Sequence, residues 1–327
     1  MTSSIRVQRG ITAIASLAFV SFMTVGTASA ADLAPIAYTK APTTPEPTSD
    51  IHGFVDVGFS NDYITPRGLL VTNTGLTSQV AVGLSIDVYK NKSGFINTIS
   101  VYGGVWNDLW SAQNNPTVGS YNEVDWWGGA KIRFAKDWII DAQYIEFVSP
   151  PNNFGTEQHV TAALTYDDTS WGLPVQLKPY VRGWYETSGP SDVTTGRGGG
   201  SGYVEFGVTP TYNATKLGWG VILTAPTWVS VGPKTFWTAS AATVCGTVGS
   251  PCGTSNAGVF STGLTATVPV TWIPKNFGSW SVRAGFQYYH LLNDYLLQGQ
   301  VNTGTAANYG AAKRDIVAGL AGFGFNF

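Results

Sequence analysis

The sequence predicts an all-β protein, an antiparallel up-and-down transmembrane β-barrel of about 12 strands with a disordered N-terminal lead-in. Three observations support this fold class. Apolar and polar residues alternate from Ile51 almost to the last residue, and a period of two is typical of strands with one buried face. The connections alternate between short and long, as in membrane barrels. Only 12% of the residues are charged and 13% are aromatic, a composition that suits strands facing lipid.

We expect the first 50 residues to lie outside the barrel. Residues 1–30 resemble a secretory signal peptide, with a basic start, an apolar stretch over residues 11–26 and the small-residue cleavage site Ala28-Ser29-Ala30. A transmembrane helix would need a longer apolar run of about 20 residues. Residues 31–50 hold four prolines and little apolar surface, which predicts a disordered periplasmic linker. An exported membrane protein without such a helix is expected to be a closed barrel, because only helices and barrels satisfy every backbone polar group in lipid.

Residues 51–327 are expected to form the barrel itself. The expected strands, each near the roughly ten residues of a tilted membrane strand, cover 51–62, 76–89, 95–107, 121–134, 137–147, 156–167, 174–187, 202–212, 217–229, 258–272, 279–291 and 314–327. Connections after even-numbered strands are short and those after odd-numbered strands are mostly longer. Together with the even strand count, this predicts that both termini lie in the periplasm.

The fifth expected strand interrupts the alternation. Ile145 and Phe147 fall out of phase with Trp138 and Ile140, and we expect a β-bulge between the two pairs. A secreted β-sandwich would also alternate. The strand lengths, the alternating loop lengths and the aromatic residues near strand ends favour the membrane barrel over the sandwich.

The last strand reads D-I-V-A-G-L-A-G-F-G-F-N-F, with apolar residues on one face and mostly small or polar residues on the other. A terminal Phe327 on such a strand resembles the assembly signal of Gram-negative outer-membrane β-barrel proteins. The resemblance implies insertion by the barrel-assembly machinery into a membrane of lipid and lipopolysaccharide. An open strand edge in lipid would leave backbone groups unsatisfied, so we expect this strand to pair with residues 55–59 of the first strand.

The first expected strand ends in the segment of residues 60–68, which reads S-N-D-Y-I-T-P-R-G. It resembles an S-D-Y-x-x-R-G-like segment near the start of an uncharacterised family of proteobacterial barrel proteins, from which it departs at Asn61 and Pro66. This resemblance implies a fold and an outer-membrane location, and it brings no substrate or catalytic residue. The similarity to narrow porins rests on architecture alone and is an analogy.

Charged residues on the inward face suggest a selective lumen. The expected pore-lining residues are Asp62, Glu123, Asp125, Glu157, Glu186 and Glu205 toward the outside, Arg182 near mid-depth, and Lys131, Arg133, Asp141, Lys178 and Arg283 toward the periplasm. Rings of carboxylates favour cations and basic rings favour anions. We therefore expect an acidic outer vestibule that leads to a mixed or basic constriction. The alternative is a salt-bridge network that fills a narrow barrel.

Aromatic residues also alternate inward in the expected register. They are Tyr102, Trp106, Tyr121, Trp127, Tyr180, Trp184, Tyr203 and Tyr289. A small barrel must fill its interior with side chains, and aromatic faces can also stack on sugars or aromatic solutes. The sequence favours filling and leaves both roles open.

The sequence offers little for catalysis. The histidines His52, His159 and His290 lack the accompanying serine and orienting group that a triad needs, and we expect them to be isolated residues near the membrane interfaces. We expect no enzyme, no catalytic, cofactor-binding or metal site, and no cofactor. Cys245 and Cys252 lie in a Gly/Thr/Ser-rich segment. They are expected to form a disulfide in an outer loop, because two thiols without nearby His or carboxylates make a poor zinc site.

Taken together, these features favour an outer-membrane channel for passive diffusion of small hydrophilic solutes or ions. A plugged structural or interaction barrel with exposed loops is the alternative, and an outer-membrane lipid-modifying enzyme is a weaker one. The formal net charge of -2 gives no reason to expect nucleic acid as a partner. The solute, the openness of the lumen and the oligomeric state are left open.

Overall fold

The computed structural model describes residues 51–112, 120–188, 190–191, 197–198, 200–214, 218, 220–237 and 255–327. The expected signal peptide, the expected linker and the expected Cys245–Cys252 disulfide all lie outside the described residues. Within the described ranges, no helix is both long and apolar enough to cross a membrane.

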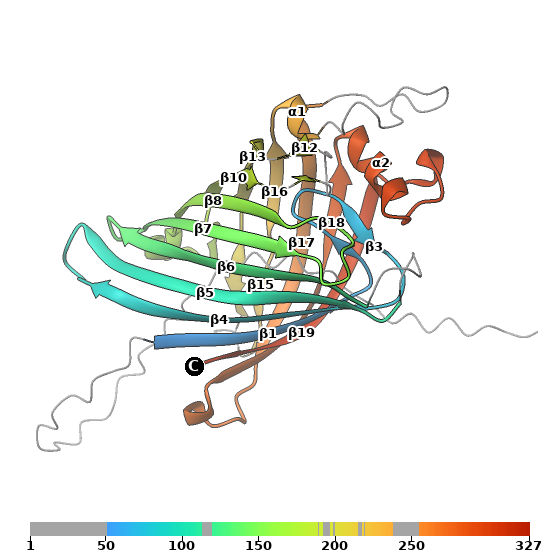
Figure 1. Ribbon diagram of the computed structural model, residues 1–327. Helices are drawn as coiled ribbons and strands as arrows, with labels where there is room; N and C mark the ends of the chain where they lie inside the picture. The colour runs from blue at the N-terminus through green and yellow to red at the C-terminus, as the bar shows by residue number, and fades with distance from the viewer. Residues whose placement is uncertain are drawn as a thin grey trace, which may run out of the picture.

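Twelve antiparallel wall strands close into a barrel in the described part of the chain, which confirms the predicted fold class (Figure 1). They are β1 Ile51–Ser60, β4 Thr77–Lys90, β5 Ile96–Trp110, β6 Tyr121–Phe134, β7 Trp138–Val148, β8 Glu157–Tyr166, β9 Val175–Gln176 with β10 Tyr180–Ser188, β13 Gly202–Val208 with β14 Thr211–Asn213, β15 Ile222–Thr224 with β16 Thr227–Val231, β17 Ala257–Pro269, β18 Ser279–Leu291 and β19 Asp315–Asn326. Each wall strand pairs with the next along the chain, as in an up-and-down barrel.

The remaining elements belong to the connections. They are the short strands β2 Tyr63–Ile64, β3 Leu70–Thr72, β11 Pro190–Ser191 and β12 Arg197–Gly198, the helices α1 Lys234–Trp237 and α2 Asp294–Asn302, and the 3₁₀ turns Asp168–Trp171, Lys275–Phe277 and Tyr309–Ala311. We call the end of the barrel that carries β2, β3, α1 and α2 the long-loop end, and the opposite end the short-turn end. Residues 91–95 are a typical connection at the short-turn end.

The first and last strands close the barrel in the expected register. Val55 pairs with Phe325 and Phe59 with Ala321. Beyond β19, Gly53 and Phe327 exchange two backbone hydrogen bonds of 3.0 Å. A Cβ atom at Gly53 would lie 2.2 Å from the Phe327 ring, so this glycine leaves the space that the terminal side chain occupies.

Three neighbouring wall strands are each interrupted where one continuous strand is expected. The interruptions lie between β9 and β10, between β13 and β14, and between β15 and β16. A proline directly precedes the second segment in each case, at Pro179, Pro210 and Pro226. Proline has no N–H to donate to the ladder, while the three proline carbonyls still accept backbone bonds of 2.8 to 3.0 Å. The barrel therefore stays closed across the interruptions.

The expected β-bulge in the fifth strand is wrong. β7 pairs with β6 and with β8 without any shift of register. Ile145 and Phe147 are instead inward-facing residues of a regular strand, 7% and 8% exposed. Their apolar character reflects packing inside the barrel: Phe147 lies under the guanidinium of Arg67, 5.0 Å from its Cζ to the ring centroid.

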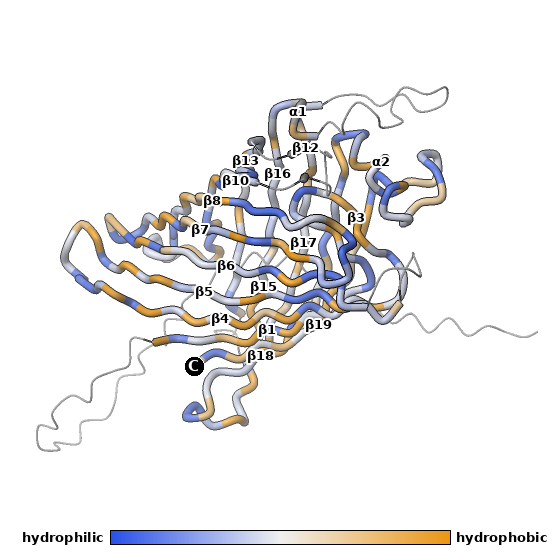
Figure 2. Tube along the Cα trace, viewed as in Figure 1, coloured by the Kyte–Doolittle hydropathy of each residue, from blue (hydrophilic) through white to orange (hydrophobic). Residues whose placement is uncertain are grey.

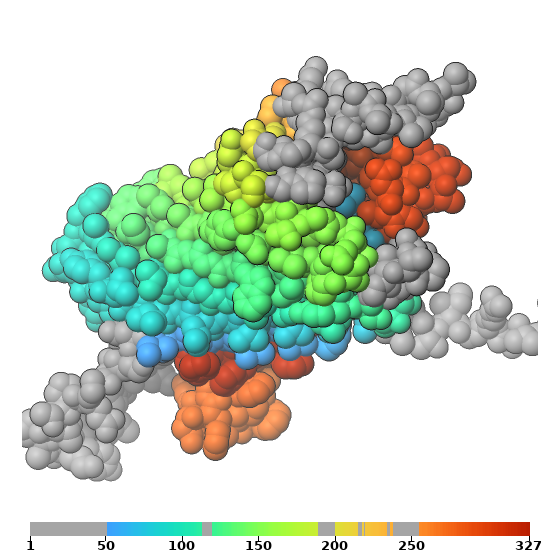
Figure 3. Space-filling view, viewed as in Figure 1, coloured from blue at the N-terminus to red at the C-terminus, as the bar shows by residue number. Residues whose placement is uncertain are grey.

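The outer surface is apolar between two sets of aromatic residues. Outward side chains such as Leu84, Val88 and Phe206 are each more than half exposed, and hydropathy alternates along the strands in Figure 2. In Figure 3 the strands β4 to β8 present an unbroken wall. The exposed aromatic residues at the short-turn end include Phe95, Trp138, Trp171, Trp272 and Phe327, and those toward the long-loop end include Tyr121, Tyr144 and Tyr185. Such paired girdles are typical of membrane barrels.

The hydrophobic core lies inside the long-loop end of the barrel. It joins residues of β2 and β3, α1 and α2 to the inward faces of β13 and of β16 to β19. In Figure 1, β3 and α2 lie at this same end. Trp228, Tyr289 and Leu291 of the wall are at most 2% exposed. The long-loop end is thus packed with side chains from three connections.

Candidate functional site: the barrel lumen

Residues 61–76, which carry β2 and β3, fold back into the barrel, and we call them the inward hairpin. Its tip is the turn Thr65-Pro66-Arg67-Gly68, in which the Gly68 N–H donates to the Thr65 carbonyl at 2.9 Å. β-turns favour proline at the second position and glycine at the fourth. Gly68 has a φ of 94°, which favours glycine. The Pro-Arg-Gly sequence thus explains the tight tip of the hairpin.

The inward hairpin spans the lumen from wall to wall. On one side the Tyr63 hydroxyl donates to Glu123 of β6 at 3.0 Å. On the other side a Cβ atom at Gly68 would lie 2.3 Å from Val259 of β17 and 2.8 Å from Leu296 of α2. β6 is the fourth wall strand and β17 the tenth of twelve, so the two contacts lie on opposite walls.

Arg67 anchors the tip of the inward hairpin to β8. Its Nη1 atom lies 3.1 Å from His159 Nε2 and 3.4 Å from Glu157 Oε2, and its side chain is 4% exposed. Burial on its own would lower the pKa of Arg67. Nearby acidic groups, of which Glu157 and then Glu186 contribute most, together outweigh that effect and raise the pKa above its ordinary value. The guanidinium therefore stays charged inside the barrel.

A group of buried carboxylates lies on one side of the lumen, where two of them contact the inward hairpin, and we call it the buried acidic cluster. Its members, each at most 8% exposed, are Asp108, Glu123, Asp125, Glu157, Glu186 and Glu205. Each comes from an inward position of β5, β6, β8, β10 or β13. Glu205, for example, accepts a hydrogen bond of 2.6 Å from Tyr180 and lies 3.9 Å from Arg182. Burying so many carboxylates is costly unless they are paired or hydrogen-bonded, and the hairpin supplies Arg67 and Tyr63 for that purpose.

A cavity of about 620 Å³ lies inside the barrel next to the inward hairpin, and we call it the lumen cavity. Tyr63, Ile64 and Pro66 of the inward hairpin form its end wall on the long-loop side, and its lining extends to His52 and Phe327 at the short-turn end. Its volume is in the range of small-molecule sites. The hairpin thus divides the lumen into a packed half and a half that holds the lumen cavity.

Charged and aromatic side chains both line the lumen cavity. Lys131 lies 3.5 Å from Asp141, whose carboxylate also accepts a hydrogen bond from Tyr102. These side chains are about a quarter exposed, at 23% for Lys131 and 28% for Asp141. Trp127 and Trp184 also contribute to the lining. The cavity therefore offers hydrogen-bonding groups of both charges next to flat apolar surfaces.

The structure separates the expected pore-lining residues into three groups. Glu123, Asp125, Glu157, Glu186 and Glu205 belong to the buried acidic cluster, while Asp125, Lys131, Asp141 and Arg182 line the lumen cavity. The remaining four belong to neither set. Asp62 accepts a hydrogen bond from Asn61 at 3.0 Å, and Lys178 lies between β9 and β10 with a φ of 47°. Arg133 pairs with Asp167 at 2.9 Å, and Arg283 pairs with Asp56 at 2.6 Å. The role of these residues in permeation stays a prediction.

Most of the expected inward aromatic residues do face the interior, but Tyr121 does not. Tyr102, Trp106, Trp127 and Trp184 line the lumen cavity, and Tyr203 and Tyr289 are buried in the core. Tyr121 is 40% exposed, and its hydroxyl donates to Asn107 on the outside. A register shift between β5 and β6 places Tyr121 opposite Leu109. One extra residue before Glu123 therefore reverses the side on which Tyr121 lies.

Each histidine lies beside a carboxylate, so the expectation of isolated residues is wrong. His52 is 3.5 Å from Asp87, and His290 is 2.7 Å from Asp315. His159 is 1% exposed inside the barrel rather than at an interface. Among the described residues, the side-chain hydrogen bonds of the His159 and His290 rings join them to Arg67, Glu157 and Asp315.

Sequence reasoning missed Arg67 and Tyr63, which fix the inward hairpin. Both belong to the S-N-D-Y-I-T-P-R-G segment, whose resemblance implied a location and no role in a site. The available signal was a turn motif, Thr-Pro-Arg-Gly, inside a long connection that also carries apolar residues such as Ile64 and Leu70. Apolar side chains in a solvated loop would stay exposed to water, so those of this connection indicated that it packs against the rest of the protein.

The comparisons with solved structures find outer-membrane proteins. An outer membrane channel from Pseudomonas putida F1 covers 90% of this chain and 100% of its own, with a TM-score of 0.42 and 9% identity. The NanC porin covers 84% and 98%, with a TM-score of 0.42 and 10% identity. The translocator domain of the autotransporter NalP from Neisseria meningitidis covers 85% and 87%, with a TM-score of 0.38 and 14% identity.

No family model and no curated protein matches the sequence. The resemblance of residues 60–68 to a proteobacterial barrel family therefore stays a prediction. Because the TM-scores are below 0.5, the description of the fold rests on the closed strand order of this chain.

Proposed function

We propose that the protein is an outer-membrane channel of the porin type, through which small hydrophilic solutes or ions diffuse passively. The observation that carries the proposal is the lumen cavity, a charged and aromatic space of about 620 Å³ inside a closed barrel. The apolar outer surface matches hydrocarbon. A barrel with an apolar exterior and a polar interior suits transport better than a purely structural role.

In this proposal the inward hairpin is the closing element of the channel. Tyr63 and Arg67 bind Glu123 and Glu157 of the buried acidic cluster, and residues of the hairpin form the end wall of the lumen cavity. Solutes then pass only when the hairpin leaves this position. Loops on a rigid scaffold commonly open and close access to the space that they cover.

Conductance in planar lipid bilayers tests the proposal. Refolded wild-type protein should show brief, infrequent openings, because the inward hairpin is held at both sides of the lumen. A variant in which residues 63–72 are replaced by a short Gly/Ser linker should show long-lived openings. If that variant inserts fully and conducts no ions, the channel proposal fails and the plugged structural barrel becomes the better account.

The proposal also includes the location and the assembly route. We propose that the termini face the periplasm, that lipid and lipopolysaccharide surround the barrel, and that the barrel-assembly machinery recognises Phe327. Deletion of Phe327 should reduce the amount of protein in the outer membrane, and Asn326→Ala, on the inward face of the same strand, should reduce it far less. Equal membrane levels of the deletion variant and the wild type would contradict the assembly role.

A further inference from the structure

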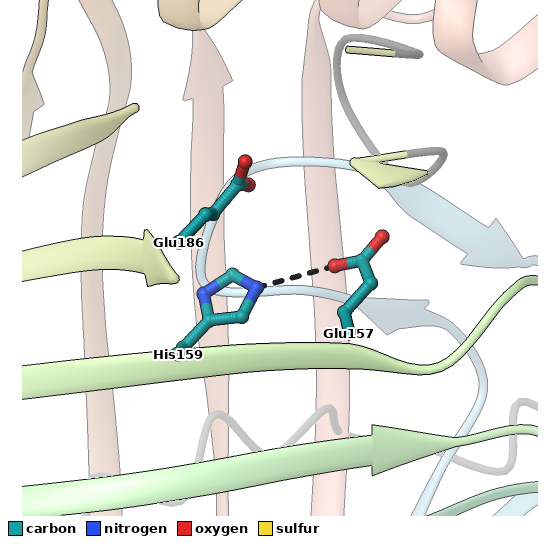
Figure 4. A group of neighbouring side chains, drawn as sticks. All are labelled: Glu157, His159 and Glu186. Carbon is teal, nitrogen blue, oxygen red and sulfur yellow. Dashed lines mark hydrogen bonds and ion pairs between the residues drawn. The ribbon is translucent and has the colours of Figure 1, made fainter. Parts of the chain in front are cut away.

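Three metal-ligating side chains meet inside the barrel at the tip of the inward hairpin. Glu157 and His159 lie on β8, and Glu186 of β10 pairs directly with His159. One ligand atom from each residue lies within 4.8 Å of the other two. The three residues are 1%, 1% and 3% exposed. Figure 4 shows the His159 ring between the two carboxylates.

A positive charge already belongs to this group. Arg67 Nη1 lies 3.1 Å from His159 Nε2 and 3.4 Å from Glu157 Oε2, so the hairpin inserts a cation at the edge of the three ligands. The second ring nitrogen, His159 Nδ1, is buried and has no hydrogen-bond partner among the described residues. Arg67 and Glu157 both face Nε2, so an ion in the place of the guanidinium would bind Nε2, and the proton of the neutral ring would then lie on Nδ1.

We propose that Glu157, His159 and Glu186 form a binding site for a divalent transition-metal ion, which competes with Arg67 for the same position. Zinc accepts both carboxylate oxygen and imidazole nitrogen as ligands, and sites with three protein ligands keep a fourth position open for water. The imidazole disfavours magnesium and calcium, which prefer oxygen ligands. A tetrahedral ion with bonds of about 2.1 Å holds its ligands roughly 3.5 Å apart, so the side chains need to approach by about an ångström.

The lumen cavity gives an ion a route to this site. Thr161 follows His159 on the inward face of β8, Trp184 precedes Glu186 on that of β10, and both line the lumen cavity. A metal ion that takes the place of the guanidinium releases Arg67 from β8 and loosens the tip of the inward hairpin. Metal binding and the closed hairpin therefore oppose each other, and binding is measurable whether or not the protein conducts.

Zinc titration of the full-length, detergent-folded protein against a chromophoric chelator tests the site. Wild type should bind Zn²⁺ weakly, and Arg67→Ala should bind it roughly tenfold more tightly or better, because the competing cation is removed. His159→Ala or Glu186→Gln, each combined with Arg67→Ala, should abolish the gain. The matched control is His290→Ala in the same background, which removes an exposed histidine and should leave the gain intact.

Three results would overturn the proposal. The first is Zn²⁺ affinity in Arg67→Ala equal to that of wild type, and the second is an unchanged gain in both double variants. The third is equal binding of Mg²⁺ and Zn²⁺ by Arg67→Ala, which would mean that the carboxylates attract any divalent ion without the imidazole. If the His159 variant does not fold, the visible spectrum of Co²⁺ bound to Arg67→Ala decides: it should show tetrahedral coordination, and an octahedral spectrum counts against the site.

Discussion

The packed half and the cavity half of the lumen share the same twelve strands and differ in what fills them. In the long-loop half the inward hairpin and α2 bury apolar residues such as Ile64 and Leu296 against the wall. In the short-turn half the wall surrounds the lumen cavity, which is lined by ion pairs such as Lys131–Asp141. In both halves, successive side chains along a strand point alternately into the barrel and out of it. A connection that folds inward, rather than the wall, decides which half is filled.

The charges of the two halves also differ in burial. The Arg67 and Glu157 side chains are 4% and 1% exposed, whereas those of Lys131 and Asp141 are 23% and 28% exposed. Breaking a buried pair leaves an uncompensated charge, and solvent screens an exposed one. The packed half should therefore depend on its charges for stability, and the cavity half should use its charges mainly to act on what enters.

The largest expected effect comes from removing the inward hairpin. Replacing residues 63–72 by a Gly/Ser linker takes away the end wall of the lumen cavity and should convert brief openings into a steady current. The matched control replaces residues 91–94, a turn at the short-turn end, by a linker of equal length. Single-channel recording should show wild-type behaviour for that control. An equal rise of the current in both variants would mean that the inward hairpin does not control the opening of the channel.

The second largest expected effect is a loss of stability, which should differ between substitutions of Arg67 and Lys131. Arg67→Ala removes the guanidinium that lies beside the buried carboxylate of Glu157, which should lower the free energy of unfolding by about 3–5 kcal/mol or drive the hairpin out of the lumen. Lys131→Ala breaks a pair whose side chains are about a quarter exposed and should cost about 1 kcal/mol or less. Urea unfolding in detergent micelles gives both values, and protease cleavage within residues 61–76 reports release of the hairpin. Equal losses for the two variants would contradict the contrast in burial.

The third effect separates packing from backbone strain at two glycines. Gly68 has a φ of 94°, and a Cβ atom added there would lie 2.3 Å from Val259. Gly172 has a φ of 67°, and a Cβ atom added there would have nothing within 4 Å. Alanine at either position strains the backbone by about 1 kcal/mol or more. Gly68→Ala should cost about 1–3 kcal/mol beyond that, because it overpacks the core. Thermal unfolding of the two variants checks the difference, and equal shifts would mean that the hairpin tip is loosely held.

The fold could be predicted from the sequence because the wall obeys a simple rule. Alternation, loop lengths and the terminal Phe327 each report on a strand in lipid, and the closing pair Val55–Phe325 follows from them. The period of two fails where a proline or an extra residue interrupts a strand. Pro179 interrupts a strand without opening the barrel, and Tyr121 reverses its side through one extra residue.

The lumen was harder to predict, since the register places each side chain on a face but does not tell what meets it there. Glu157 and His159 could be assigned to the wall, yet their partner Arg67 lies 90 residues or more away in a connection. Phe147 appeared out of phase only because the pattern assumes a polar interior. A loop that returns into a barrel makes part of that interior a hydrophobic core, and no strand periodicity encodes such a return.

The smallest expected effect is a change of ion preference in the cavity half. Lys131→Gln removes a positive charge beside Asp141 and keeps a side chain of similar length, so an open channel should shift toward cations. Reversal potentials under a potassium chloride gradient measure the shift, best in the variant that lacks residues 63–72. Glu123→Gln in the same background removes a carboxylate of the packed half and should shift the preference toward anions, because without the hairpin this group lines the path. If Lys131→Gln leaves the reversal potential unchanged while Glu123→Gln moves it, selectivity belongs to the packed half, and the lumen cavity only conducts.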